Sequence, residues 1–153
     1  MQNELETKRV LVVDDDRDFV KTLEVYLKYA GYEVSCAFGG IGALEELRIT
    51  NPSAVILDVM MPDIDGRRVV RYIREKMGDS TPVIILSALS DPNSRMDLLM
   101  EGANEFLTKP CEPERIFKTV EHVTTPDSDF LDSHLRLVAQ TRVGPGPRWY
   151  RGG

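Results

Sequence analysis

The stretch ILDVMMPDIDG, residues 56–66, starts as an apolar strand and then becomes a polar loop. Ile56 and Leu57 are apolar, Asp58 follows them at once, and the loop that comes next contains a Pro and a Gly. A carboxylate at the end of a buried strand costs free energy unless a partner or a bound group uses its charge. Asp58 is therefore the first candidate functional residue.

Short apolar segments of the same kind occur along the chain. The five predicted strands are VLVV (10–13), YEVSCAF (32–38), AVIL (54–57), PVIIL (82–86) and NEFLT (104–108). The first, third and fourth lack the alternation of a half-exposed strand, which is typical of strands that are buried on both faces.

A helical pattern follows each predicted strand. In residues 17–31 one face carries Phe19, Val20, Leu23, Tyr26, Leu27 and Ala30. Further helices are predicted within 39–50, 67–78 and 94–103 and from about Pro113 to residue 123, with Gly31, Gly78 and Gly102 as stops. Because strand and helix alternate five times, we expect an α/β fold, a doubly wound parallel sheet with helices on both faces.

The composition changes after residue 123. Residues 1–123 should form one domain, and residues 124–153 form a tail with a turn, a short amphipathic helix at 129–142 and a Gly- and Pro-rich end. About 30 residues are too few for a second hydrophobic core. The sequence leaves open whether an effector domain follows residue 153.

Charge and cysteine content exclude several classes of protein. A net charge of −6 argues against a general binder of nucleic acids or anionic membranes. Cys36 and Cys111 lack the spacing of a metal or redox motif, and isolated thiols suit a reducing cytoplasm. The polar N-terminus has no signal segment, and no window approaches the roughly 20 apolar residues of a membrane span. We expect a soluble cytoplasmic protein.

Carboxylates follow two of the predicted strands. Asp14, Asp15 and Asp16 come after the first strand as Asp58 comes after the third, and in the sheet order 2-1-3-4-5 these strands are neighbours that end at one crevice. Carboxylates so close repel one another, and a divalent cation removes this conflict. Hard oxygen ligands with positions left for water favour Mg²⁺. Asp16 has a simpler explanation as the N-cap of the first helix.

Two more polar residues lie at strand ends. Ser87 follows the apolar run of the fourth predicted strand, and Lys109 follows the fifth. Singly, a Ser after a strand reads as a turn residue and a Lys before Pro as an exposed one. With Asp14 and Asp58 they place carboxylates, a hydroxyl and an ammonium at one edge of the sheet, which indicates a functional site.

The motifs VLVVDDD, ILDVMMPDIDG, VIILSAL and GANEFLTKP, in this order across residues 8–122, resemble the CheY-like receiver domains of response regulators in two-component signalling. The resemblance implies a flavodoxin-like (βα)5 three-layer sandwich. It also implies that Asp58 is the phosphoacceptor and that Asp14, Asp15, Asp58 and the backbone carbonyl of Met60 are ligands of Mg²⁺.

The resemblance extends to switching and to partners. It makes Lys109 the partner of the phosphoryl group, Ser87 the switch hydroxyl and Phe106 the switch aromatic, and it implies a cis peptide bond at Lys109-Pro110. The implied donor is a phosphohistidine of a sensor histidine kinase or of a histidine phosphotransfer protein. The face of the fourth helix, fifth strand and fifth helix would then act on a downstream protein or form a homodimer, without direct DNA binding by this chain. In this family the residues two after the phosphoacceptor and two after the switch hydroxyl, here Met60 and Leu89, flank the path of the hydrolytic water.

We consider three alternative functions. A phosphatase or phosphotransferase with an Asp nucleophile typically has a second Asp two residues later, where this chain has Met60. A receiver-like module that is never phosphorylated would not need the complete acidic set. A phosphotransfer-histidine helix around His134 lacks the neighbouring Gly or Pro signals, and His134 and His122 read as structural or solvated residues.

Overall fold

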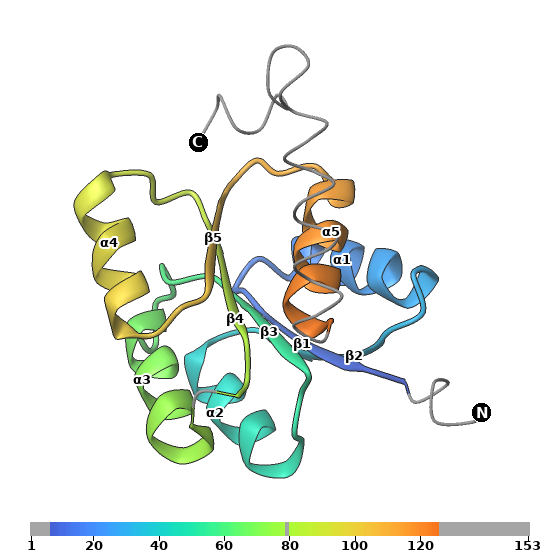
Figure 1. The fold of residues 1–153 in the computed structure, drawn as a ribbon, viewed down its shortest axis with the longest axis horizontal. Coiled ribbons are helices and arrows are strands. Elements are labelled where there is room, and N and C mark those ends of the chain that lie inside the picture. Colours follow the sequence, from blue (N-terminus) through green and yellow to red (C-terminus); the bar gives the residue numbers. More distant parts are fainter. Residues whose placement is uncertain (1–6, 79, 126–153) are drawn as a thin grey trace.

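The computed structural model describes residues 7–78 and 80–125. Strands and helices alternate along these residues (Figure 1). In chain order they are β1 (Arg9–Val13), α1 (Arg17–Tyr29), β2 (Glu33–Ala37), α2 (Gly40–Ile49), β3 (Ala54–Leu57), α3 (Gly66–Met77), β4 (Val83–Ser87), α4 (Pro92–Glu101), β5 (Glu105–Thr108) and α5 (Pro113–Thr124). The five predicted strand–helix units are confirmed, with boundaries that shift by at most two residues.

All neighbouring strands are parallel, and their order is β2-β1-β3-β4-β5, as predicted. Every residue of β3 and β4 is buried, in agreement with their continuous apolar sequences. Val13 of β1 pairs with Leu57 of β3, so these two central strands end side by side. This register brings the residues that follow them to the same edge of the sheet.

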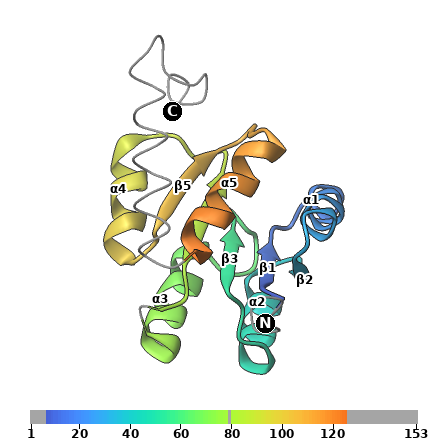
Figure 2. The same cartoon turned by 45° about the vertical axis from the view of Figure 1, so that its right-hand side comes forward.

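Helices cover both faces of the sheet, which gives the expected three layers (Figures 1 and 2). On one face α2, α3 and α4 pack in a first apolar cluster, which includes Ala43, Val69, Val70, Ile73 and Leu98. On the other face α1 and α5 pack in what we call the α1–α5 cluster, which includes Val20, Leu23, Leu27, Ile116 and Val120. Alternate residues of each central strand contribute to the two clusters, since side chains point to opposite faces of a sheet.

The apolar face of α1 is narrower than the sequence predicts. Val20, Leu23 and Leu27 are buried, whereas Tyr26 is 42% exposed and Ala30 is exposed. Tyr26 lies at the margin of the helix contact, where its ring and the Phe117 ring on α5 form a T-shaped pair with a centroid distance of 6.2 Å. Tyr26 therefore lies partly in the core and partly on the surface.

The helix ends follow the sequence signals. Asp16 is the N-cap of α1, and its side chain accepts a hydrogen bond from the backbone N–H of Phe19 at 3.1 Å. Gly78 and Gly102 end α3 and α4 with φ of 75° and 122°, in the left-handed region that a glycine tolerates. The predicted cis peptide bond at Lys109-Pro110 is present.

The Arg74 side chain joins the ends of several elements. Its guanidinium donates hydrogen bonds to the backbone carbonyls of Gly78, Thr81 and Gly102 and to the side-chain oxygen of Asn104, at 2.8–3.0 Å. Asn104 in turn accepts from the backbone N–H of Val83 at 2.7 Å. The end of α3, the start of β4 and the end of α4 are therefore tied to one another.

Some predictions concern residues beyond those described. The proposed helix at 129–142 and His134 lie outside the described residues, and the boundary at residue 123 stays a prediction. His122 lies half-buried in the last turn of α5. Within the described ranges, every helix is too short or too polar to cross a lipid bilayer.

Candidate functional site

The candidate site lies at the edge of the sheet where β1 and β3 end. The backbone N–H of Asp58 donates to the carbonyl of Val13 at 3.0 Å, which continues the β1–β3 pairing by one residue. Asp14 and Asp58 are 2% and 7% exposed, whereas Asp15 is exposed to solvent. The sheet register thus holds two buried carboxylates next to each other and places a third beside them.

These three carboxylates form one group. Asp14, Asp15 and Asp58 can each offer an oxygen such that all three atoms lie within 4.8 Å of one another. Burial raises the pKa of Asp14, and the hydrogen bonds that it accepts from Lys109 and from the backbone N–H of Asp16 offset this only in part. Hard oxygen donors that leave positions for water fit Mg²⁺, so the predicted metal ligands are compatible with this ion.

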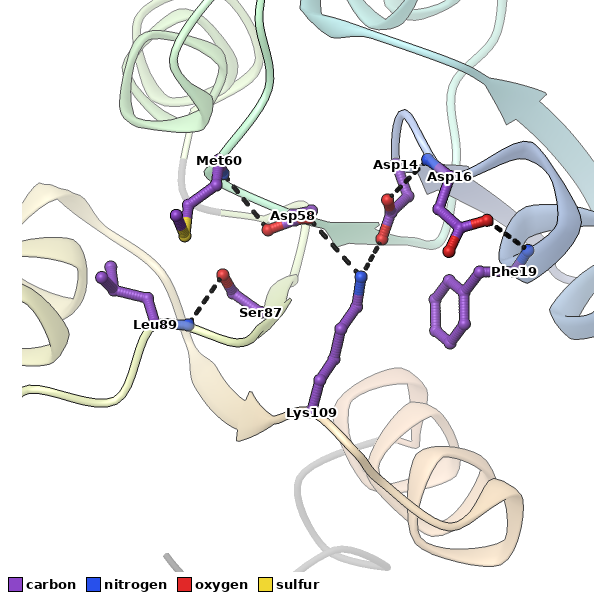
Figure 3. A network of polar contacts seen from close by, with 8 residues as sticks. All are labelled: Asp14, Asp16, Phe19, Asp58, Met60, Ser87, Leu89 and Lys109. Carbon is purple, nitrogen blue, oxygen red and sulfur yellow. Dashed lines mark hydrogen bonds and ion pairs between the residues drawn. The ribbon is translucent and has the colours of Figure 1, made fainter.

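Lys109 reaches the same group from the end of β5 (Figure 3). Its Nζ lies 2.5 Å from Oδ2 of Asp14 and 3.5 Å from Oδ2 of Asp58. Burial by itself lowers the pKa of Lys109, but the contacts with Asp14 and Asp58 outweigh burial and raise the pKa above its ordinary value. The ammonium therefore keeps its charge at neutral pH and partly balances the carboxylates.

The loop after Asp58 is packed tightly against the start of α3. The backbone N–H of Met60 donates to Oδ1 of Asp58 at 3.2 Å, and Gly66 donates to the carbonyl of Val59 at 3.0 Å. A Cβ on Gly66 would lie 2.5 Å from Cα of Val59, which no side chain can accept. The glycine of the opening motif therefore lets α3 begin directly beside the phosphoacceptor candidate.

Asp63 has a role that the sequence did not reveal. Its carboxylate accepts hydrogen bonds from the backbone N–H groups of Gly40 and Ile41, both at 3.0 Å, and so caps the start of α2 from another loop. These two hydrogen bonds lower the pKa of the Asp63 carboxyl, and the bond from Ile41 has the larger effect. The signal that could have pointed to such a cap is Gly39, since this N-cap residue of α2 has no side chain to serve as one.

Ser87 and Phe106 lie on the β4 and β5 side of the site. Ser87 is fully buried at the end of β4, and its Oγ accepts a hydrogen bond from the backbone N–H of Leu89 at 3.3 Å (Figure 3). Phe106 is half-buried on β5, and the guanidinium of Arg95 on α4 lies 4.9 Å from its ring centroid. Arg95 also donates to Oγ1 of Thr108 at 3.1 Å. The ring of Phe106, the predicted switch aromatic, therefore lies against the Arg95 side chain of α4.

The structure brings four of the predicted residues into direct proximity: Asp14, Asp15, Asp58 and Lys109. Met60 joins them through its backbone, and Figure 3 shows Ser87 and Met60 on one side of Asp58 with Lys109 and Asp14 on the other. Phe106 belongs to the adjoining surface of β5. Phe19, whose ring contacts the ammonium of Lys109, was not among the predicted site residues.

Comparison with known proteins gives one consistent family. The chain is 36% identical over 151 residues to the response regulator MprA of Mycobacterium leprae, and 43% identical over 110 residues to the transcriptional regulatory protein PrrA of the same species. These alignments cover 92% and 72% of this chain but only 65% and 47% of the two relatives. The chain therefore spans about half to two thirds of the length of these relatives.

Solved structures indicate the same family as the sequence relatives. The chemotaxis response regulator CheY4 of Vibrio cholerae superimposes with a TM-score of 0.73 at 31% identity, over 77% of this chain and 99% of CheY4. The family model of the response regulator receiver domain matches residues 10–121, from β1 to α5. Since this match includes all five strands and the carboxylates at their ends, the chain belongs to the response regulator receiver family.

Proposed function

We propose that Asp58 accepts a phosphoryl group from a phosphohistidine of a sensor histidine kinase or of a histidine phosphotransfer protein. The observation that carries this proposal is the position of Asp58, buried at a strand end beside two further carboxylates and within 3.5 Å of the ammonium of Lys109. A carboxylate held there can act as a nucleophile without a general base.

The chemistry needs positive charge, because the carboxylate and the phosphoryl group repel each other. Lys109 places one such charge next to Asp58. When bound by Asp14, Asp15, Asp58 and the backbone carbonyl of Met60, Mg²⁺ supplies further positive charge to the same place. An oxygen of Asp58 forms the new P–O bond while the P–N bond of the donor breaks, and the donor imidazole leaves with that electron pair.

Output is proposed to pass through Ser87 and Phe106. The Ser87 hydroxyl donates a hydrogen bond to the new phosphoryl group and draws the loop after β4 inward. Phe106 then turns toward the space that the loop has left, which changes the surface formed by α4, β5 and α5. This surface acts on a downstream protein or on a second copy of the chain, in the cytoplasm.

A receiver domain is a signalling module rather than a catalytic enzyme. The alternative of a phosphatase with an Asp nucleophile is therefore set aside, in line with Met60 at the position where such enzymes have their second Asp. Phosphorylation and dephosphorylation of Asp58 itself are the only reactions that we propose.

Intact-mass spectrometry tests the proposal. Incubation with a small phosphodonor and Mg²⁺ should add the mass of one phosphoryl group, and Asp58→Asn should abolish the addition. EDTA should prevent labelling of the wild type. Asp18→Asn, which changes an exposed carboxylate on α1, is the matched control and should be labelled normally. Labelling that persists in Asp58→Asn would show that another residue is the phosphoacceptor.

A further inference from the structure

Three groups surround the ammonium of Lys109. Its Nζ contacts Asp14 at 2.5 Å and Asp58 at 3.5 Å, and it lies 4.4 Å from the centroid of the Phe19 ring (Figure 3). An aromatic face within about 6 Å attracts a cation through the ring quadrupole, and more strongly where water is excluded. The Lys109 side chain is only 23% exposed, so this contact is partly shielded from water.

Phe19 is itself held in place from two directions. Its backbone N–H donates to the N-cap Asp16, which fixes the first turn of α1. Its side chain packs against the α1–α5 cluster. These contacts hold the ring more firmly than the flexible side chain of Lys109, so the ring can restrict the position of the ammonium.

Lys109 and a metal ion compete for the same carboxylate. Nζ contacts Oδ2 of Asp14, and Asp14 is one of the three carboxylates that could hold a cation. A metal ion held by Asp14 would weaken the contact with Lys109, and a lysine side chain has many other rotamers to adopt. A cation held by the three carboxylates would also draw on Asp58, so the face of Phe19 is the contact of the ammonium that such a cation does not claim.

We propose that Phe19 is a positioning residue for Lys109, whose ring face keeps the ammonium beside Asp58 when a divalent cation takes the carboxylate of Asp14. The inference rests on the proposed phosphorylation of Asp58. It assigns a residue of the first helix to the site in addition to those at the strand ends.

Substitutions at Phe19 separate the ring face from apolar packing. Phe19→Leu keeps an apolar side chain but removes the ring, and Phe19→Tyr keeps the ring. With a small phosphodonor, the Leu variant should be phosphorylated between about twofold and thirtyfold more slowly, and the Tyr variant at nearly the wild-type rate. Phe19→Met gives the same comparison if the Leu variant does not fold.

Affinity for Mg²⁺ distinguishes positioning from damage to the pocket. Calorimetric titration without phosphodonor should show unchanged or tighter Mg²⁺ binding in Phe19→Leu, because Lys109 competes less strongly for Asp14. A loss of Mg²⁺ affinity that parallels the loss of rate would show that the substitution distorts the carboxylates, and the proposal would be wrong.

A second readout does not depend on phosphorylation. In proton NMR, the ε-methylene of Lys109, assigned by its absence in Lys109→Arg, should show an upfield ring-current shift that is lost in Phe19→Leu. In the wild type the shift should persist when Mg²⁺ is added. Its disappearance with Mg²⁺ would refute the inference, whereas a persistent shift in a protein that cannot be phosphorylated would contradict the proposed function alone.

Phe38 offers a matched control on the same side of the molecule. Its ring contacts two cations of α1, Arg17 at 4.2 Å and Lys21 at 5.8 Å, whereas Lys109 lies over the ring of Phe19. Phe38→Leu should be phosphorylated like the wild type. An equal slowing in Phe38→Leu would show a general effect of losing rings near α1 and would overturn the assignment.

Discussion

At the scale of single residues, the lifetime of the phosphorylated state should depend on Met60 and Leu89. The Met60 side chain is 59% exposed, whereas Leu89 is half-buried and packs against the first apolar cluster. Figure 3 shows both side chains next to Asp58 and Ser87. Neither side chain can hydrogen-bond a water molecule strongly, and both are large enough to cover an acyl phosphate on Asp58.

We therefore expect slow self-dephosphorylation and a faster reaction in the double variant Met60→Asn, Leu89→Glu. Each ~1.4 kcal/mol gained by positioning water is worth about tenfold in rate. A time course of phosphate release measures the difference. Met100→Asn, the same change at a methionine on α4 that is more exposed than Met60, is the control. Equal rates for wild type and double variant would show that these residues do not limit access of water.

At the scale of the elements, Asp63 connects the phosphoacceptor loop with the start of α2. Asp63→Ala should lower the free energy of unfolding by about 0.5–1 kcal/mol, the lower half of the range for losing an N-cap, because Asp63 is exposed. Urea denaturation monitored by circular dichroism measures the change. Asp63→Asn, which keeps an acceptor oxygen, should lose less than Asp63→Ala.

The pH dependence of this effect has a defined direction. Hydrogen bonds from Ile41 and Gly40 lower the pKa of Asp63 below its ordinary value of 3.8, so the folded state favours the ionised carboxylate. The stability difference between wild type and Asp63→Ala should be complete at neutral pH. It should shrink as the pH falls below 3.8 and through the pKa of the folded protein. A difference that stays constant at low pH would exclude the carboxylate as its source.

The sequence predicts the elements better than the contacts between them. β3 and β4 arise from continuous apolar runs, which are typical of strands buried on both faces, and they lie at the centre and beside the centre of the sheet. Asp14, Asp58 and Lys109 could be predicted because each comes directly after a strand. The role of Phe19 could not be predicted, because an apolar residue on the buried face of α1 is already explained by packing. Its contact with Lys109 forms only when α1 packs on the sheet. The Asp63 cap likewise joins residues 22 or 23 positions apart in the sequence.

At the scale of the whole molecule, the 153-residue chain by itself should not bind DNA specifically. Its net charge is −6, and the described residues form a single receiver fold with five strands and five helices. Titration of the phosphorylated and unphosphorylated chain onto duplex DNA at physiological salt measures this. A sequence-specific footprint of the chain alone would contradict the prediction and would point to a DNA contact outside the described residues.

The two ends of α4 are held unequally, because Arg74 donates two hydrogen bonds to Gly102 at the C-terminal end, whereas Arg95 near the N-terminal end donates one, to Thr108. The Arg74 hydrogen bonds tie Gly102, the residue just after the helix, to α3 and β4, so α4 should pivot about its C-terminal end. Ten residues at 1.5 Å each give a helix of about 15 Å, and a tilt of roughly 10° about the C-terminal end then moves the N-terminal end by about 2.5 Å. A partner that contacts the helix near Pro92 therefore meets a much larger displacement than one near Glu101, and the amplitude of any signal carried by α4 depends on where along the helix it is read.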